Sequence, residues 1–287
     1  MKNNNYRTRF APSPTGPLHL GHAYSALVAW DRAQAAGGEF LLRIEDIDQS
    51  RARSEWEAAI YDDLRWLGLT WPKPVMRQSD RLNAYRAALQ QLWDAGLLYP
   101  CTCTRRDIAE AASAPQEGAP VSGPDGVIYP GTCRGNARGG SMPSGVALRL
   151  DIKKAAQLID VDTGFEEVGP VHGPSSHRVD AAAMQTTVGD VVLARRDMAT
   201  SYHLSVVVDD AAQDITEVVR GADLFEATPI HVLLQALLEI PTPRYYHHNL
   251  IRDDDGKRLA KRDDARALSL YRSQGRSPND IRRMVGL

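Results

Sequence analysis

The chain has 287 residues, enough for one large domain or two small ones, and its 34 Lys and Arg residues nearly balance 36 Asp and Glu residues. This balance excludes a polybasic, histone-like protein, and 43% hydrophobic with 24% charged residues is typical of a soluble globular protein. Three cysteines make a poor disulfide framework and indicate a reducing compartment. The sequence shows neither a signal-peptide pattern nor an apolar run long enough to span a membrane. We therefore expect a cytoplasmic protein without membrane contact.

Short apolar runs alternate with amphipathic segments along the first hundred residues. Leu20, Ala23 and Leu27 recur at helical spacing, and Gly37 is a typical helix end. Ser54 stands where it could cap a later helix. The expected elements are strands at residues 6–12, 40–44 and 97–100 and helices at 19–36, 54–67 and 80–96. Strand, helix, strand, helix in this order favours a parallel α/β sheet with helices on both faces.

Residues 104–145 interrupt this alternation. They are rich in Ala, Gly, Ser and Pro and have little periodicity, which predicts a loop or flexible insertion. The α/β pattern then returns with strands at 146–152, from 191 and at 215–219, and helices near 201–212 and 229–238.

Charge is concentrated at the C-terminal end. Residues 244–287 hold 11 Lys and Arg against 6 Asp and Glu, a net charge of +5. Since the whole chain has a net charge of −2, residues 1–243 carry −7. A basic end on an acidic body favours a polyanionic partner, although a solvated helical surface explains it equally well.

Two motifs near opposite ends of the chain have the chemistry of a phosphate site. His19 and His22 stand three residues apart at an expected helix start, where backbone amides and the helix dipole bind anions. Gly21 between them allows close approach of a nucleotide. Residues 256–262 carry four cations after a glycine and could clamp a triphosphate. Taken alone, the histidine pair is more typical of ordinary surface histidines, and the basic segment is more typical of a solvated charge run or part of a nucleic-acid patch.

Taken together and in order, these motifs resemble the conserved blocks of glutamyl-tRNA synthetases, which are class I aminoacyl-tRNA synthetases. The similar blocks are residues 9–16 with 19–22, 43–48, 202–210, 219–224 and 258–262. The last block stands in place of the Lys-Met-Ser-Lys-Ser loop. The resemblance implies a Rossmann-like parallel sheet with an inserted zinc-binding, acceptor-type subdomain and a short helical C-terminal end.

This resemblance divides the chain into four parts. Residues 1–100 would form the first half of the catalytic domain, 101–190 the inserted zinc-binding subdomain, 191–243 the second catalytic half, and 244–287 the signature loop and helical end. Full-length relatives continue into an anticodon-binding domain, whereas this chain ends soon after the signature loop. It is therefore similar to the short glutamyl-Q subfamily.

The subfamily resemblance implies a reaction with three substrates. Its members activate L-glutamate with ATP and attach it to the queuosine base at the wobble position of tRNA(Asp). The triplet at residues 13–15 also fits glutamyl rather than glutaminyl enzymes. Two alternatives stay open: a ligase that acts on a tRNA 3′ end or another acceptor, and a non-catalytic tRNA-binding module that kept the fold. In either case we expect a monomer.

The resemblance also assigns catalytic and ATP-binding roles. His19 and His22 would stabilise the α-phosphate of ATP, and Lys261 would hold the leaving pyrophosphate. Gly21 and Arg258 would complete the ATP site, and Mg²⁺ would arrive with the nucleotide. Arg258 replaces the usual first lysine of the signature loop and Ala260 its serine, so a hydroxyl is lost while the charge is kept.

A glutamate site follows from the same blocks. Arg9 and Arg220 would bind carboxylates, Glu45 the α-ammonium group, and Tyr202 would donate a hydrogen bond nearby. Without the family context, each arginine would be assigned to a structural ion pair and Glu45 to a helix-capping acidic cluster. The loop residues of the site would be Phe10, Ala11, Pro12 and Ser13. Relatives often have Asn at position 206, where this chain has Val206.

The cysteines form a partial metal motif. Cys101 and Cys103 follow a predicted strand and Cys133 ends the irregular segment, which leaves three thiolates one ligand short of a closed zinc site. The subfamily pattern, Cys-x-Cys followed by Tyr-x₃-Cys, implies one structural Zn²⁺ with Tyr129 as fourth ligand. Other candidates are water, His172 and His177, and three inert cysteines without metal are the alternative. The zinc would fold the insertion over the acceptor-binding side.

Overall fold

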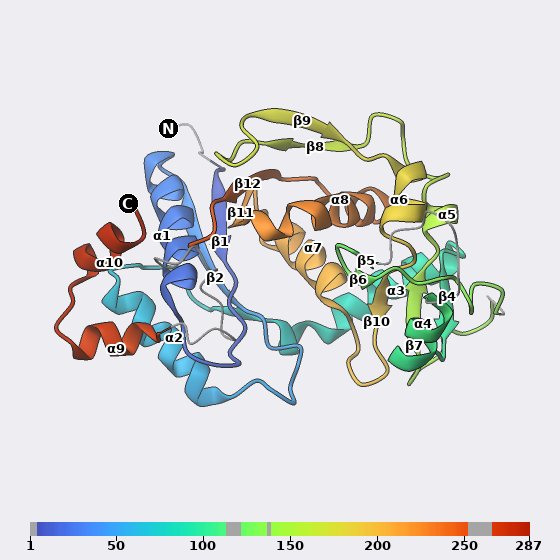
Figure 1. The fold of residues 1–287 in the computed structure, drawn as a ribbon, viewed down its shortest axis with the longest axis horizontal. Helices are drawn as coiled ribbons and strands as arrows, with labels where there is room; N and C mark the ends of the chain where they lie inside the picture. Colours follow the sequence, from blue (N-terminus) through green and yellow to red (C-terminus); the bar gives the residue numbers. More distant parts are fainter. Residues whose placement is uncertain (1–4, 113–121, 137–138, 252–265) are drawn as a thin grey trace.

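The computed structural model describes residues 5–112, 122–136, 139–251 and 266–287. Within these ranges, none of the helices combines the length and the apolar character that crossing a membrane would require. Figure 1 shows an elongated molecule, with the N-terminal helices and the C-terminal end on one side and the inserted segment on the other.

A parallel sheet occupies the centre of the fold. Parallel pairing joins β3 to β2, β2 to β1 and β11 to β12. The Thr216 amide donates to the Arg7 carbonyl at 3.1 Å and thereby ties β11 to β1. The strands, in this order, are β3 (Met76–Arg77), β2 (Glu39–Ile44), β1 (Arg7–Phe10), β11 (Glu217–Gly221) and β12 (Arg244–His248). The parallel α/β sheet expected from the sequence is confirmed.

Two further strands extend this sheet beyond β12. β8 (Gly164–Glu167) pairs with β12 in parallel, and β9 (Ser175–Arg178) pairs with β8 antiparallel (Figure 1). Neither strand was expected, because their sequences lack the alternation of apolar and polar residues that marks a half-buried strand.

Helices cover the sheet and form two hydrophobic cores. One core is built around α1 and α2 and the other around α3, α7 and α8. The helices are α1 (Leu20–Ala35), α2 (Ser54–Trp66), α3 (Leu82–Asp94), α7 (Tyr202–Ala212) and α8 (Thr228–Leu237). Short 3₁₀ turns precede α3 (Gln78–Arg81) and α8 (Ala222–Ala227). Asp209 on α7 accepts hydrogen bonds from Gln78 and Tyr85, and so joins the two halves of the fold.

The C-terminal end returns to the first helix. α9 (Leu268–Ser273) and α10 (Pro278–Met284) lie beside α1 and α2 in Figure 1. Arg282 forms a bidentate ion pair with Asp31 on α1: its Nη1 and Nη2 donate to the two carboxylate oxygens at 2.7 and 2.8 Å. Ile281 and Leu268 are buried in the same core as α1. The expected helical C-terminal end is therefore present in the described part of this segment.

A separate antiparallel sheet spans the predicted insertion at residues 101–190 and its borders, and is formed by β4 (Leu98–Cys101), β7 (Ala147–Leu150) and β10 (Val192–Ala194). The insertion also contains α4 (Arg105–Ala112), the hairpin of β5 (Ser122–Gly123) and β6 (Gly126–Val127), α5 (Ile152–Ala155) and α6 (Ala181–Thr187). The prediction of a loop or flexible insertion over 104–145 is therefore wrong in part. α4 is polar and exposed, and the strands of the hairpin have two residues each, so neither element produces an apolar periodicity that the sequence could show.

One cap prediction is also wrong. Ser54 is the first residue inside α2, and Arg53 is the N-cap without a side-chain capping bond. The predicted starts of α1, α7 and α8 agree with the structure to within one residue.

Candidate active site

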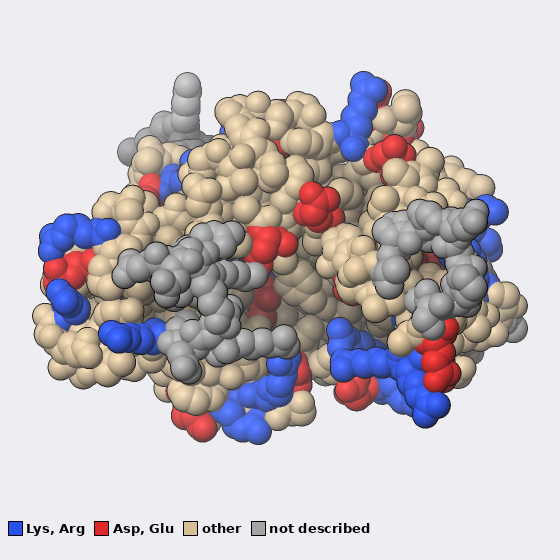
Figure 2. Space-filling view, viewed as in Figure 1, with Lys and Arg blue, Asp and Glu red and all other residues tan. Residues whose placement is uncertain are grey.

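A cavity of about 400 Å³ lies at the carboxyl ends of β1 and β11. In an open parallel sheet, neighbouring strands whose connections leave in opposite directions create a crevice at this edge, and ligands bind there. Figure 2 shows the surface hollowed near its centre, between the part that contains α1 and the part that contains β10. The predicted site residues that line the cavity are Arg9, Phe10, Ala11, His19, Gly21, His22, Glu45, Tyr202 and Arg220.

Two predicted site residues, Pro12 and Ser13, do not line it, and two others lie outside the described residues. Pro12 is buried and its carbonyl accepts a hydrogen bond from the Glu45 amide at 3.0 Å, while Ser13 is exposed. Arg258 and Lys261 lie outside the described residues, as does Ala260. Val206, the position where relatives often have Asn, is buried in the core around α7.

The histidine pair forms the N-terminus of α1. His19 is the N-cap, and its Nδ1 accepts a hydrogen bond from the Gly21 amide at 3.1 Å. Nδ1 of His22 accepts from the His19 amide at 3.2 Å, and the two ring centroids lie 3.8 Å apart. Because each Nδ1 accepts, the hydrogen of each neutral ring lies on Nε2, which makes Nε2 the hydrogen-bond donor. Two such donors beside the helix dipole suit a phosphate group.

Arg9 is held in a buried ion pair. Its Nε donates to Asp210 at 2.9 Å, and Arg43 donates to the same carboxylate oxygen at 2.7 Å. Burial alone would raise the pKa of Asp210, but the two guanidinium groups outweigh it and lower that pKa. The alternative interpretation of Arg9 as a structural ion pair therefore describes its contacts, although it also lines the cavity.

Glu45 lies at the end of β2, on the wall of the cavity. Arg43 donates to its carboxylate at 3.2 Å. Burial raises the pKa of Glu45, and the charges of Arg43 and Arg9 offset part of this rise. Its neighbour Asp46 accepts hydrogen bonds from Ser79, and Asp48 accepts one from Arg51. The three carboxylates therefore do not form one capping cluster.

Arg220 differs from the other buried arginines. It is 6% exposed, yet no carboxylate in the described parts of the chain lies within ion-pair distance of it. Its guanidinium donates instead to neutral groups: His231 at 2.9 Å, His247 at 3.1 Å and Thr228 at 2.8 Å. Burial and the charge of Arg220 lower the pKa of both histidines, that of His247 to about 4. A buried cation without a carboxylate partner has the chemistry that suits an anionic ligand.

Sequence reasoning missed several residues that line or support the cavity. Ser25, one turn after His22 on α1, shares a hydrogen bond of 2.7 Å with His248 at the end of β12, and both line the cavity. His231 and His247 reach Arg220 from α8 and β12. None of these histidines belongs to a recognisable sequence motif, so only the tertiary contacts reveal their place at the cavity.

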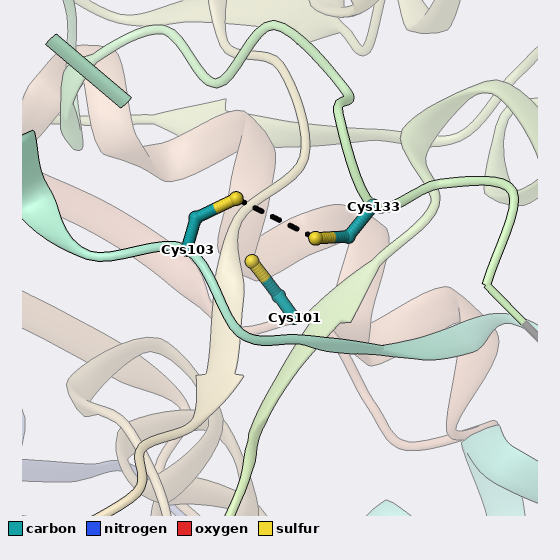
Figure 3. Close-up of side chains that lie close together, drawn as sticks. All are labelled: Cys101, Cys103 and Cys133. Carbon is teal, nitrogen blue, oxygen red and sulfur yellow. Dashed lines mark hydrogen bonds between the residues drawn. The ribbon is translucent and has the colours of Figure 1, made fainter. Parts of the chain in front are cut away.

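The cysteine prediction agrees with a compact cluster in the insertion. The Sγ atoms of Cys101, Cys103 and Cys133 lie within 4.8 Å of one another and point toward a common centre (Figure 3). The hydroxyl of Tyr129 lies 3.4 Å from the sulfurs of Cys101 and Cys103 and accepts from the Cys133 amide at 2.8 Å. The three cysteine sulfurs fit a zinc site, and the Tyr129 hydroxyl lies beside them where a fourth ligand of a tetrahedral site would stand.

Placement favours these four donors over the histidines, whereas the pKa values of the thiols shift in opposite directions. Burial raises the pKa of Cys103 to about 11, whereas hydrogen bonds from Tyr129 and the Thr102 backbone outweigh burial and lower that of Cys133 to about 6. His172 and His177, the other candidate ligands, stack on Phe225 and Phe165. Among the described residues, the metal-type cluster contains the three cysteines and no histidine.

Comparisons with known proteins agree with this geometry. The family model of tRNA synthetases class I (E and Q), catalytic domain, matches residues 5–130 and 166–287. The chain is 65% identical to a glutamyl-Q tRNA(Asp) synthetase of Rhodobacter capsulatus over 98% of this chain and 99% of that protein. It is 43% identical to a protein of the same name in Nocardia farcinica, over 95% of this chain and 81% of that protein.

A solved structure shares the fold. It is a glutamate tRNA ligase of Elizabethkingia meningosepticum in complex with its amino acid, with a TM-score of 0.68 and 28% identity over 90% of this chain and 52% of that structure. The fold, the cavity and the family match together define a class I tRNA synthetase catalytic domain of the glutamyl and glutaminyl type. Within this class, the chain belongs to the glutamyl-Q tRNA(Asp) synthetase family.

Proposed function

We propose that this protein activates L-glutamate with ATP and transfers it to the queuosine base of tRNA(Asp). The observation that carries the proposal is a single cavity that joins a helix N-terminus bearing His19 and His22 to the buried cation Arg220. The first feature suits a nucleotide phosphate and the second suits the carboxylate of an amino acid. The acceptor follows from the family to which the chain belongs.

The activation step joins glutamate to AMP. A carboxylate oxygen of glutamate attacks the α-phosphorus of ATP, and the bond from that phosphorus to the pyrophosphate oxygen breaks. Negative charge grows on the α-phosphate oxygens, where Nε2 of His19 and of His22 and the first-turn amides of α1 can donate hydrogen bonds. Mg²⁺ arrives with ATP and binds mainly through its phosphates. Lys261 and Arg258 are proposed to bind the pyrophosphate.

The transfer step forms an ester. A hydroxyl of the queuosine cyclopentene ring attacks the carbonyl carbon of glutamyl-AMP, loses its proton, and AMP leaves. We assign one glutamate carboxylate to Arg220, because this guanidinium is the buried one without a carboxylate partner among the described arginines of the cavity. Glu45 is assigned to the α-ammonium group and Tyr202 to a hydrogen bond beside it. The loop from Phe10 through Ala11 and Pro12 to Ser13, together with Arg9, closes this part of the site.

We further propose that Cys101, Cys103, Cys133 and Tyr129 hold one structural Zn²⁺. Their four donor atoms already converge, and none of them lines the cavity. A bound zinc would cross-link β4 to the segment after the β5–β6 hairpin and so stabilise the insertion. It would take no part in the chemistry. The protein is proposed to act as a cytoplasmic monomer.

The test is ATP-dependent transfer of labelled glutamate to total tRNA from cells with and without queuosine. Incorporation only into tRNA(Asp) of the queuosine-containing pool supports the proposal. Equal incorporation into both pools would instead identify an acceptor at the tRNA 3′ end, and periodate oxidation of unmodified tRNA would then abolish it. Exchange between pyrophosphate and ATP without transfer to tRNA would leave activation intact and refute the acceptor.

A further inference from the structure

A chain of hydrogen bonds leads from Arg220 to the surface of the inserted segment. Nη1 of Arg220 lies 2.9 Å from Nδ1 of His231. Nε2 of His231 lies 3.0 Å from Nδ1 of His203, and Nε2 of His203 lies 3.1 Å from Oδ1 of Asp125. Four side chains from β11, α8, α7 and the β5–β6 turn are thus connected in series.

The direction of every bond in this chain is fixed by its first member. A guanidinium group only donates, so Nδ1 of His231 must accept, and its hydrogen must lie on Nε2. That hydrogen is donated to Nδ1 of His203, which leaves the hydrogen of His203 on Nε2, facing the carboxylate of Asp125. Burial and the charge of Arg220 lower the pKa of His231, which keeps its ring neutral.

A second chain holds the other side of the guanidinium. Nε of Arg220 donates to Nε2 of His247, whose Nδ1 lies in hydrogen-bond contact with the buried Glu167. In both chains a neutral imidazole touches Arg220, and the carboxylate stands at least one ring away. The guanidinium is therefore oriented from two sides, while no carboxylate of these chains neutralises it directly.

The two terminal carboxylates differ in exposure. Glu167 is 1% exposed and is part of the core, whereas Asp125 lies on the exposed turn of the hairpin. The hairpin is firmly seated: a Cβ added to Gly123 would lie 2.3 Å from the carbonyl oxygen of Thr187 on α6. Its turn places Asp125 within hydrogen-bond distance of His203.

We propose that Asp125 is a positioning residue for Arg220, acting through His203 and His231. The inserted segment would thereby set the orientation of the guanidinium that binds glutamate, although none of its described residues lines the cavity. This inference rests on the proposed role of Arg220 in glutamate binding. Without an acceptor at position 125, His203 can move its hydrogen to Nδ1, and the bond from His231 is then lost.

The experiment compares Asp125→Ala with Asp125→Asn, which keeps an acceptor oxygen. The control is Asp160→Ala, at an exposed aspartate that takes no part in these hydrogen bonds. Exchange between pyrophosphate and ATP gives the KM values for glutamate and for ATP. We expect Asp125→Ala to raise the KM for glutamate roughly three- to tenfold, the effect of one buried hydrogen bond. The KM for ATP should stay unchanged. The KM of Asp125→Asn for glutamate should lie close to the wild-type value.

Imidazole ¹⁵N NMR gives a readout that a purely structural role would not move. The wild-type His203 should carry its hydrogen on Nε2, and Asp125→Ala should shift it, whereas Asp125→Asn should not. An unchanged KM for glutamate with unchanged His203 signals would overturn the inference, and so would an equal rise of both KM values. Absence of glutamate-dependent exchange in the wild type would instead refute the proposed function, while the ¹⁵N signals would still test the hydrogen-bond chain.

Discussion

Arg220→Lys tests the assignment of the glutamate carboxylate to Arg220. Lysine keeps the positive charge but lacks the planar fork, so it cannot contact His231, His247 and a substrate carboxylate together. Loss of one hydrogen bond between charged groups costs about 1.5–3 kcal/mol. The KM for glutamate should therefore rise roughly 10- to 150-fold in the pyrophosphate exchange assay, whereas the KM for ATP should change little.

The control for this variant is Arg178→Lys. Unlike Arg220, Arg178 forms an ion pair, with Asp162 at 3.0 Å; both partners are exposed and neither lines the cavity. Its kinetics should match the wild type. A folded Arg220→Lys protein with a wild-type KM for glutamate would refute the assignment and direct attention to Arg9.

Two further predictions concern the metal site and a buried acid. Cys103→Ser should reduce the zinc bound per chain, measured by elemental analysis, and lower the melting temperature, measured by calorimetry. A wild-type protein that is isolated without zinc and binds none when zinc is added would contradict the site. Burial and the nearby Asp62 raise the pKa of Asp63 to about 6, so its protonated form is favoured in the folded state. Stability should therefore fall as the pH rises from about 4 to about 6, and Asp63→Asn should be more stable at pH 7 by roughly 1–3 kcal/mol, with no difference below pH 4. Urea unfolding at both pH values measures this effect, and parallel pH profiles for the two proteins would contradict it.

The central fold was predictable because its helices repeat apolar residues at helical spacing. α1 and α8 begin within a residue of the expected positions for this reason. β8 and β12 were missed because they pair with each other from distant parts of the sequence, and β9 was missed because its polar, partly exposed sequence forms a strand only by pairing with β8. Arg244–His248 contains two histidines and an arginine, and it becomes a sheet strand only because β11 and β8 lie on either side.

The residues of the candidate site could be predicted where they belong to a short local motif. His19 and His22 shape one helix N-terminus, and Cys101 and Cys103 stand two residues apart. The support of Arg220 could not be predicted in this way. His231 stands 11 residues after it, and the role of each histidine depends on which atom faces it in the fold.

The difference between Arg9 and Arg220 explains how one cavity can hold two arginines with separate tasks. Asp210 neutralises Arg9 directly, so a second carboxylate gains little by approaching that guanidinium. Arg220 is surrounded by imidazoles that accept its hydrogen bonds without adding negative charge. A neutral side chain such as that of glutamine would leave the buried charge of Arg220 uncompensated, whereas a carboxylate removes this cost. With the side-chain carboxylate of glutamate assigned to Arg220, the proposal makes discrimination against glutamine depend on keeping His231 and His247 uncharged, and on placing Asp125 and Glu167 no closer than one ring away.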